Sequence, residues 1–257
     1  MGGGLQGFAL HPLASAGKKK IMQKIIHRAA SRSFSNHGWL QSYHTFSFAG
    51  YYNEERIHFG ALRVLNDDMV KGGMGFGTHP HDNMEIVSIP LNGALEHRDN
   101  TGRHEVIRTN EVQIMSAGTG ISHSEFNASK TEPVSFLQIW VFPKLRNISP
   151  RYQQQAFEPA ARNNKLQIVV SPEQDSGALL INQDAWFSLG KFDEGNTVDI
   201  VPKMEQQGSY LFVLEGEIEV AGEVLQRRDA IALTDFDKVT VTALKAAEFL
   251  LIDVPMN

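Results

Sequence analysis

Short runs of aliphatic, β-branched and aromatic residues dominate the sequence after residue 55, and Gly, Asn, Asp and Pro separate them. Runs of this length and spacing are typical of β-sandwiches and small β-barrels. No long segment follows a 3.6-residue hydrophobic period, and only residues 150–162 indicate a short helix or a single turn. The sequence therefore predicts an all-β protein. The predicted strands are 58–65, 84–90, 111–115, 134–142, 166–170, 210–214, 217–220, 230–233, 238–243 and 249–254.

A weak internal repeat indicates that this β-structure is built twice. Residues 91–96 (LNGALE) resemble residues 214–219 (LEGEIE), and each segment follows an apolar run. Each is then followed by an acidic residue, Glu111 or Asp229, that opens another apolar run. Two copies of one barrel, joined in the Pro-containing stretch 142–159, explain this pattern; chance similarity of two hairpins is the alternative.

The histidines form the strongest chemical signal. All ten lie within the first 123 residues, and two of them stand in the sequence Gly77-Thr78-His79-Pro80-His81. Side chains at positions i and i+2 of a strand point to the same face, and Pro80 favours an extended conformation at His79. His123 and Glu125 have the same spacing and follow Gly118 and Gly120, which predict a tight turn. Two strands would therefore bring three histidines and one carboxylate together.

Imidazole nitrogens with one carboxylate oxygen suit Fe, Mn, Co, Ni, Cu or Zn, and do not suit Ca or Mg. In an octahedral shell, four protein ligands leave two positions open for a substrate oxygen and for dioxygen or water. The alternative is that an isolated His-x-His pair is an ordinary surface feature. The second pair, His123 and Glu125, favours a site for one divalent transition metal.

The spacing of these residues resembles that of cupins. Gly73, His79, His81 and Glu85 match the start of the first cupin motif, and Gly118, Gly120, His123 and Asn127 match the end of the second. The carboxylate on the second motif resembles the pirin family in particular, as do residues 37–40 (HGWL), 44–48 (HTFSF), 61–68 (ALRVLNDD), 114–120 (IMSAGTG) and 138–140 (QIW). The resemblance runs from about residue 22 to the last residue, and it is to the bacterial, quercetin 2,3-dioxygenase-like branch.

The resemblance implies a bicupin, in which two antiparallel β-barrels of the jelly-roll type pack face to face. We expect residues 1–21 to be a leader, residues 22–150 to form the metal-binding barrel and residues 151–257 to form a second barrel. With the two repeats aligned, Pro202 and Met204 stand where His79 and His81 stand in the first. No histidine follows His123, so we expect the second barrel to bind no metal and to have a structural role.

The resemblance also implies a function: ring-opening 2,3-dioxygenation of flavonols such as quercetin, with release of carbon monoxide. His79, His81, His123 and Glu125 would bind the metal, for which iron is the first expectation. Glu125 would also act as the general base for the flavonol 3-hydroxyl group. The alternatives are a metal-containing, redox-responsive transcriptional cofactor with a protein partner and no turnover, or a cupin isomerase or hydrolase.

The remaining candidates have simpler interpretations. We expect His97 and His104 to be surface histidines, with reserve ligands as the alternative. Glu85 would either orient a ligand by a hydrogen bond or be a solvated strand residue. Met74 and Phe76 are candidates for an apolar substrate pocket. The residues expected mainly to pack in the protein are His44, Phe46, Phe48, Trp39, Trp140 and Trp186.

Charge and composition exclude several other classes. The formal net charge is −5, and the first acidic residue is Glu54, so the basic residues of the leader region precede a mildly acidic body. Such a body argues against a nucleic-acid-binding face. No apolar run is long enough for a membrane span. There is no cysteine, which excludes disulfides but leaves the compartment open; we expect a cytoplasmic protein. Residues 1–21 resemble a dispensable leader more than a targeting segment.

Overall fold

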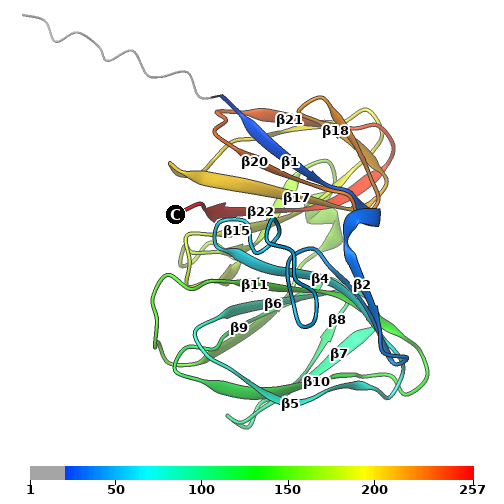
Figure 1. The fold of residues 1–257 in the computed structure, drawn as a ribbon, viewed down its shortest axis with the longest axis vertical. Helices are drawn as coiled ribbons and strands as arrows, with labels where there is room; N and C mark the ends of the chain where they lie inside the picture. Colours follow the sequence, from blue (N-terminus) through cyan, green and yellow to red (C-terminus); the bar gives the residue numbers. More distant parts are fainter. Residues whose placement is uncertain (1–20) are drawn as a thin grey trace, which may run out of the picture.

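A computed structural model describes residues 21–257, so the predicted leader lies, except for Ile21, outside the described residues. The described chain forms two stacked β-domains, each made of one seven-stranded and one four-stranded sheet (Figure 1). Its helical residues are two single turns of 3-10 helix, η1 (Ala29–Ser31) and η2 (Pro159–Arg162). No helix among residues 21–257 is long and apolar enough to cross a membrane. The predicted all-β bicupin fold is confirmed, although each barrel is a pair of sheets rather than a continuous closed ladder.

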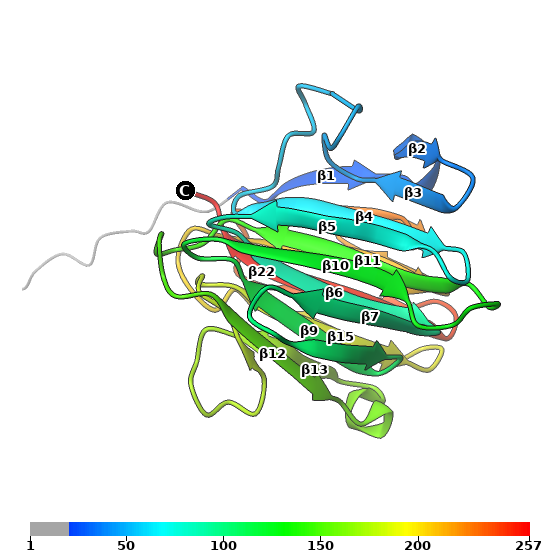
Figure 2. The same ribbon diagram turned by 90° about the horizontal axis from the view of Figure 1, so that it is seen from below.

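The N-terminal domain places a four-stranded sheet in front of a seven-stranded one (Figure 2). The four-stranded sheet has the order β5 (Gly75–His81), β10 (Ile121–Asn127), β7 (Ala94–Asp99) and β8 (His104–Arg108). The seven-stranded sheet has the order β12 (Arg151–Ala156), β9 (Glu111–Ser116), β6 (Glu85–Asn92), β11 (Val134–Val141), β4 (Leu62–Val70), β3 (Leu40–His44) and β2 (Ser33–Asn36).

The C-terminal domain repeats this arrangement. Its four-stranded sheet has the order β16 (Thr197–Ile200), β21 (Val239–Ala243), β18 (Glu217–Val220) and β19 (Glu223–Gln226). Its seven-stranded sheet has the order β1 (Gln23–His27), β20 (Ala230–Thr234), β17 (Gln207–Glu215), β22 (Ala247–Pro255), β15 (Trp186–Phe192), β13 (Leu166–Ser171) and β14 (Leu179–Leu180). The eight consecutive strands β4 to β11 occupy the same places as β15 to β22, which supports the predicted duplication, whereas the edge strands of the two seven-stranded sheets differ in chain order. Gly93 and Gly216 take the same place in both, in positive-φ turns after β6 and β17.

Each domain receives its first edge strand from the other half of the sequence. β1 pairs with β20 of the C-terminal sheet, and β12 pairs with β9 of the N-terminal sheet (Figure 1). A division of the chain between residues 150 and 151 therefore does not separate the two sets of strands. The exchange ties the domains together, because neither seven-stranded sheet is complete without a strand from the other side of the boundary.

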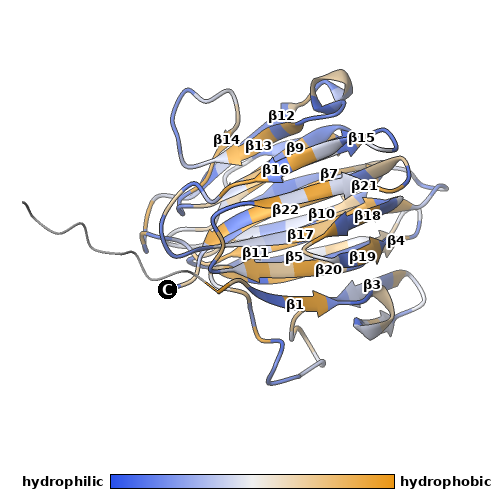
Figure 3. Ribbon diagram, turned by 90° about the horizontal axis from the view of Figure 1, so that it is seen from above, coloured by the Kyte–Doolittle hydropathy of each residue, from blue (hydrophilic) through white to orange (hydrophobic). Residues whose placement is uncertain are grey.

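The two seven-stranded sheets pack against each other through the largest apolar cluster among residues 21–257. Val87 and Leu137 of the N-terminal domain join Tyr210 and Leu250 of the C-terminal domain in it. Hydrophobic and hydrophilic residues alternate along many strands (Figure 3), as expected when the two faces of a sheet meet different surroundings. Between the two sheets of the C-terminal domain lies a second continuous apolar cluster. The equivalent space of the N-terminal domain holds two smaller apolar clusters and a group of polar side chains.

Sequence patterns located the apolar strands better than the polar ones. All ten predicted strands are present, although β4 begins at Leu62 and not at residue 58. The prediction of a short helix or a single turn within residues 150–162 is confirmed by the single turn η2, and residues 151–156 of the same stretch form β12. The strand β12 (RYQQQA) was missed because it lies at a sheet edge and has no apolar alternation.

Candidate metal centre

Two neighbouring strands carry the predicted histidine ligands. β5 and β10 pair in antiparallel fashion, with His79 opposite His123 and His81 opposite Ile121. Gly118 and Gly120, which precede β10, have positive φ angles of 49° and 135°. The predicted extended His-x-His segment and the predicted glycine turn are therefore both present. Together they bring side chains 42 residues apart in sequence to neighbouring positions.

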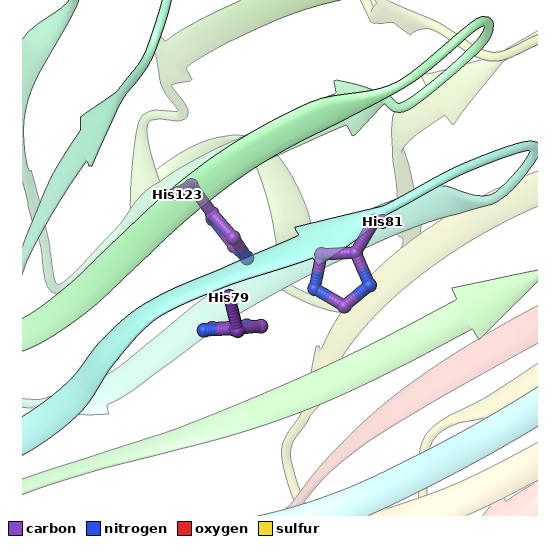
Figure 4. Close-up of side chains that lie close together, drawn as sticks. All are labelled: His79, His81 and His123. Atoms are coloured by element: carbon purple, nitrogen blue, oxygen red, sulfur yellow. The ribbon is translucent and has the colours of Figure 1, made fainter.

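The three imidazoles converge on one another (Figure 4). Their ring centroids lie 4.5 Å apart for His79 and His123, 4.8 Å for His79 and His81, and 4.9 Å for His81 and His123. One ligand atom from each residue lies within 4.8 Å of the others. This group could bind a metal ion.

Hydrogen bonding leaves the ligand nitrogens of this group available. The Nδ1 atom of His79 lies 2.7 Å from the carbonyl oxygen of Gly77. A carbonyl oxygen only accepts, so Nδ1 carries the proton and donates it, and Nε2 keeps its lone pair. The Nε2 atom of His123 is buried and has no hydrogen-bond partner among residues 21–257. A buried polar atom without a partner is costly, and a metal ion would satisfy it. The group therefore fits a transition metal.

Burial keeps the rings of His81 and His123 neutral, as metal ligands must be. Burial, with a smaller contribution from His79, lowers the pKa of His81 to about 4. Burial and the neighbouring rings His79 and His81 lower the pKa of His123 further still. Neutral imidazole presents a lone pair, so at neutral pH little proton competition opposes metal binding.

Glu125 is buried on the same strand but is not a member of the group of three. The pairing of β10 with β5 is irregular between His123 and Glu125, so Glu125 stands opposite Phe76. Its carboxylate accepts hydrogen bonds from Gln138 Nε2 at 2.7 Å and from Ser88 Oγ at 3.3 Å. Burial raises the pKa of Glu125 to about 7, and the two hydrogen bonds oppose this rise. Its role as a ligand stays a prediction.

The expectation that His97 is a surface residue was wrong. The side chain has no solvent exposure, and its ring lies 5.2 Å from that of His123. His104, by contrast, is exposed and contacts Glu96 at the surface, as expected. The internal repeat contained a signal for His97, because the alignment that places Gly93 on Gly216 places His97 on Val220, a fully buried strand residue. The Tyr152 ring, 4.7 Å from His97, gave no such signal.

Neither interpretation of Glu85 is correct, because this residue points away from the histidines and is buried. It accepts hydrogen bonds from Ser116 Oγ at 2.8 Å and from the backbone nitrogen of Asn182 at 3.1 Å. Arg151 lies 3.9 Å from the carboxylate. Side chains alternate along β6, so Glu85 shares the face of Val87 and Ile89, which packs against the C-terminal domain. Glu85 therefore connects the two domains.

Aromatic residues line one side of the histidine group. The Trp140 ring lies 5.0 Å from that of His81 and 5.3 Å from that of Phe48, which in turn contacts His44. Trp140 was expected in the core; it is only partly buried and adjoins the site. An open cavity of about 310 Å³ lies beside His81, and its lining includes Asn100 and Ile121.

Met74 and Phe76 do not line that cavity. Met74 is exposed, and Phe76 packs on Trp39 against an apolar cluster between the sheets. The prediction that they form the pocket beside the histidines is therefore not supported by their positions.

Two similar β-domains, one of which holds a histidine group that could bind a transition metal between its sheets, define the class of bicupin proteins. The family model described as Pirin matches residues 27–141, and the model described as Quercetinase C-terminal cupin domain matches residues 168–254. The chain belongs to the pirin family.

Relatives and solved structures agree with this family. Quercetin 2,3-dioxygenase of Escherichia coli (strain K12) is 40% identical over 234 residues, which are 90% of this chain and 98% of the relative. The crystal structure of the bacterial pirin YhhW from Escherichia coli in complex with nickel(II) has a TM-score of 0.86 and 38% identity, covering 91% of this chain and 99% of that chain. Quercetin 2,3-dioxygenase from Acinetobacter baumannii shares the fold, with a TM-score of 0.74 at 21% identity over 93% of this chain and 88% of that chain.

Proposed function

We propose that the protein is a metal-dependent dioxygenase that opens the ring of flavonols such as quercetin. The observation that carries this proposal is the convergence of His79, His81 and His123 within 4.8 Å, beside a buried glutamate and an open cavity. The 40% identity to a quercetin 2,3-dioxygenase supports the substrate class. The resemblance to a pirin in complex with nickel(II) supports a divalent transition metal; iron is our first expectation among Fe, Mn, Co, Ni, Cu and Zn.

The residues divide the work as follows. His79, His81 and His123 would hold the metal, and Glu125 of the same strand as His123 would be the fourth ligand. A divalent transition metal bound there would supply Lewis-acid and redox chemistry for the reaction of the flavonol with O₂. Glu125, a buried carboxylate on the same strand as His123, would take the proton of the flavonol 3-hydroxyl group.

The surroundings suit a flat aromatic substrate. Trp140 and Phe48 form an apolar wall next to His81, and His81 also lines the cavity that is open to solvent. We propose that the substrate enters through this cavity and lies against Trp140. The aromatic wall limits water at the reacting oxygen.

The proposal is tested by anaerobic loading of the purified protein with Fe(II), Mn(II), Co(II), Ni(II) or Cu(II), followed by quercetin and O₂. Loss of the flavonol absorbance together with release of carbon monoxide is the expected result. No turnover with any of these metals would overturn the proposal. A protein that binds metal, turns over no flavonol and captures a protein partner in one metal oxidation state alone would favour the transcriptional-cofactor alternative.

A further inference from the structure

Three side chains form a continuous hydrogen-bonded chain that leads away from the histidine group. The Nδ1 atoms of His123 and His97 lie 3.3 Å apart, and His97 Nε2 lies 3.1 Å from Asp99 Oδ2. The side chains of His97 and Asp99 have no solvent exposure. Strand pairing enforces this contact, because β7 and β10 place His123 opposite Asp99 and Glu125 opposite His97.

The carboxylate of Asp99, at the far end of this chain, determines which atom donates and which accepts in each hydrogen bond. A carboxylate accepts only, so His97 donates from Nε2 to Asp99. A neutral His97 that carries its proton on Nε2 has a lone pair on Nδ1, and that lone pair accepts the Nδ1 proton of His123. His123 then has its own lone pair on Nε2, which is the buried nitrogen without a partner. One tautomer satisfies every contact and directs a free lone pair into the histidine group.

A turn fixes the carboxylate in place. Asp99 Oδ1 accepts hydrogen bonds from the backbone nitrogen of Thr101 at 2.9 Å, from Thr101 Oγ1 at 2.5 Å and from the backbone nitrogen of Arg103 at 3.3 Å. These bonds leave Oδ2 for His97. Burial alone would raise the pKa of Asp99, but hydrogen bonds from Thr101, His97 and Arg103 outweigh it and lower the pKa, so the group stays ionised.

An aromatic ring shields His97 from water. Tyr152 packs 4.7 Å from the imidazole, and the guanidinium of Arg103 lies 4.8 Å above the Tyr152 ring. Tyr152 belongs to β12, the strand that the C-terminal side of the boundary contributes to this domain. A hydrogen bond in such a low-dielectric setting is stronger than one in water.

We propose that His97 and Asp99 are positioning residues that hold His123 in the Nε2-ligating tautomer and orientation for a divalent transition metal. This inference rests on the proposed function, since it requires the metal site. It predicts that both residues act through His123 and that neither contacts the metal. Loss of such an outer hydrogen bond typically costs about 10–100-fold in metal affinity.

Co(II) binding tests the inference without reference to turnover. The affinity of the full-length apo-protein is measured by competition with a chelator, and the visible absorption of bound Co(II) reports the ligand arrangement. We expect His97→Phe and Asp99→Leu each to weaken binding by about 10–100-fold and to alter the spectrum. His97→Asn retains an acceptor near the position of Nδ1, so its Co(II) affinity and its spectrum should be closer to those of the wild type. His104→Phe, on the exposed face of the neighbouring strand β8, is the matched control and should leave both unchanged.

The outcomes separate this inference from the proposed function. If the wild-type protein binds no Co(II), the metal site itself fails and the positioning role fails with it. If the wild-type protein binds Co(II) and His97→Phe binds it equally with the same spectrum, only the positioning role is overturned. If His97→Phe loses binding while Asp99→Leu keeps it, His97 is a direct ligand and the proposed role is again wrong. Asp99→Leu and His97→Asn keep the test decisive if His97→Phe does not fold.

Discussion

His97 and His123 are diagonal neighbours on the adjacent strands β7 and β10, with their Nδ1 atoms 3.3 Å apart. The equivalent strands of the C-terminal domain, β18 and β21, pair Val220 with Val241 in an apolar cluster. The same pair of strands thus carries hydrogen-bonded polar side chains in the N-terminal domain and aliphatic side chains in the C-terminal domain. The difference lies in a few inward-facing positions, since strand order and the turn glycines Gly93 and Gly216 are common to both.

Removal of one histidine of the group should abolish metal binding. Purified wild-type protein is expected to contain close to one equivalent of transition metal, and His81→Ala should contain almost none, because the variant loses one of the three imidazoles that converge on the site. Elemental analysis after purification without chelators measures this. His104→Ala removes an exposed histidine of the same domain and should keep the metal. Equal metal contents in wild type and His81→Ala would contradict the site.

Glu125→Gln separates metal binding from proton transfer. Glutamine has nearly the same shape but cannot take a proton, so flavonol turnover should fall by at least about 100-fold. Three histidines remain, and part of the metal content should persist. The control is Glu194→Gln in an exposed turn of the C-terminal domain. Normal turnover by Glu125→Gln would show that another group takes the proton.

Buried His27 should make the protein less stable as the pH falls. Its Nδ1 atom lies 2.8 Å from the Tyr210 hydroxyl group, and burial, with a smaller effect of Arg56, lowers its pKa to about 4. In the unfolded chain the pKa is about 6.5, so between these values the unfolded state binds the additional proton. Stability is therefore lost as the pH falls from about 6.5 to 4, by about 3 kcal/mol at most.

Urea unfolding of wild type and His27→Gln at several pH values measures this contribution. Glutamine does not titrate. As the pH falls through this window, the unfolding free energy of the wild type should therefore decrease more than that of the variant. A difference that is constant from pH 7 to pH 4.5 would contradict the prediction.

Asp67 should be important for the junction between the domains. Its carboxylate on β4 lies 2.7 Å from Arg228 Nε, in the turn before β20, and 3.6 Å from Arg32 Nη1. Both guanidinium groups are buried, so Asp67→Ala leaves two buried cations without this carboxylate and should destabilise the protein by about 3–5 kcal/mol. Thermal and urea unfolding measure the loss. Asp199→Ala breaks an exposed pair with Lys238 and should have no measurable effect.

The fold could be predicted to a large extent because strands with one buried face carry their own signal. Apolar runs such as 134–142 and 249–254 marked central strands, and the repeated LNG and LEG hairpins marked the duplication. The edge strands β1 and β12 could not be assigned to a sheet from sequence, because their partners, β20 and β9, are not adjacent along the chain. That assignment depends on packing between the two halves.

The sequence by itself indicated which three histidines come together, because the i and i+2 spacing places His79 and His81 on one face of a strand and the glycine-led segment around His123 marked a second strand. It also determined that the second copy has no histidine to offer. Only the tertiary structure decided that His97 contacts His123 and is itself in contact with Asp99 and Tyr152, that Trp140 adjoins His81, and that Glu85 turns toward the other domain. These contacts join strands that are distant in sequence. Their formation depends on how two sheets close on each other, and no local pattern in the sequence records that.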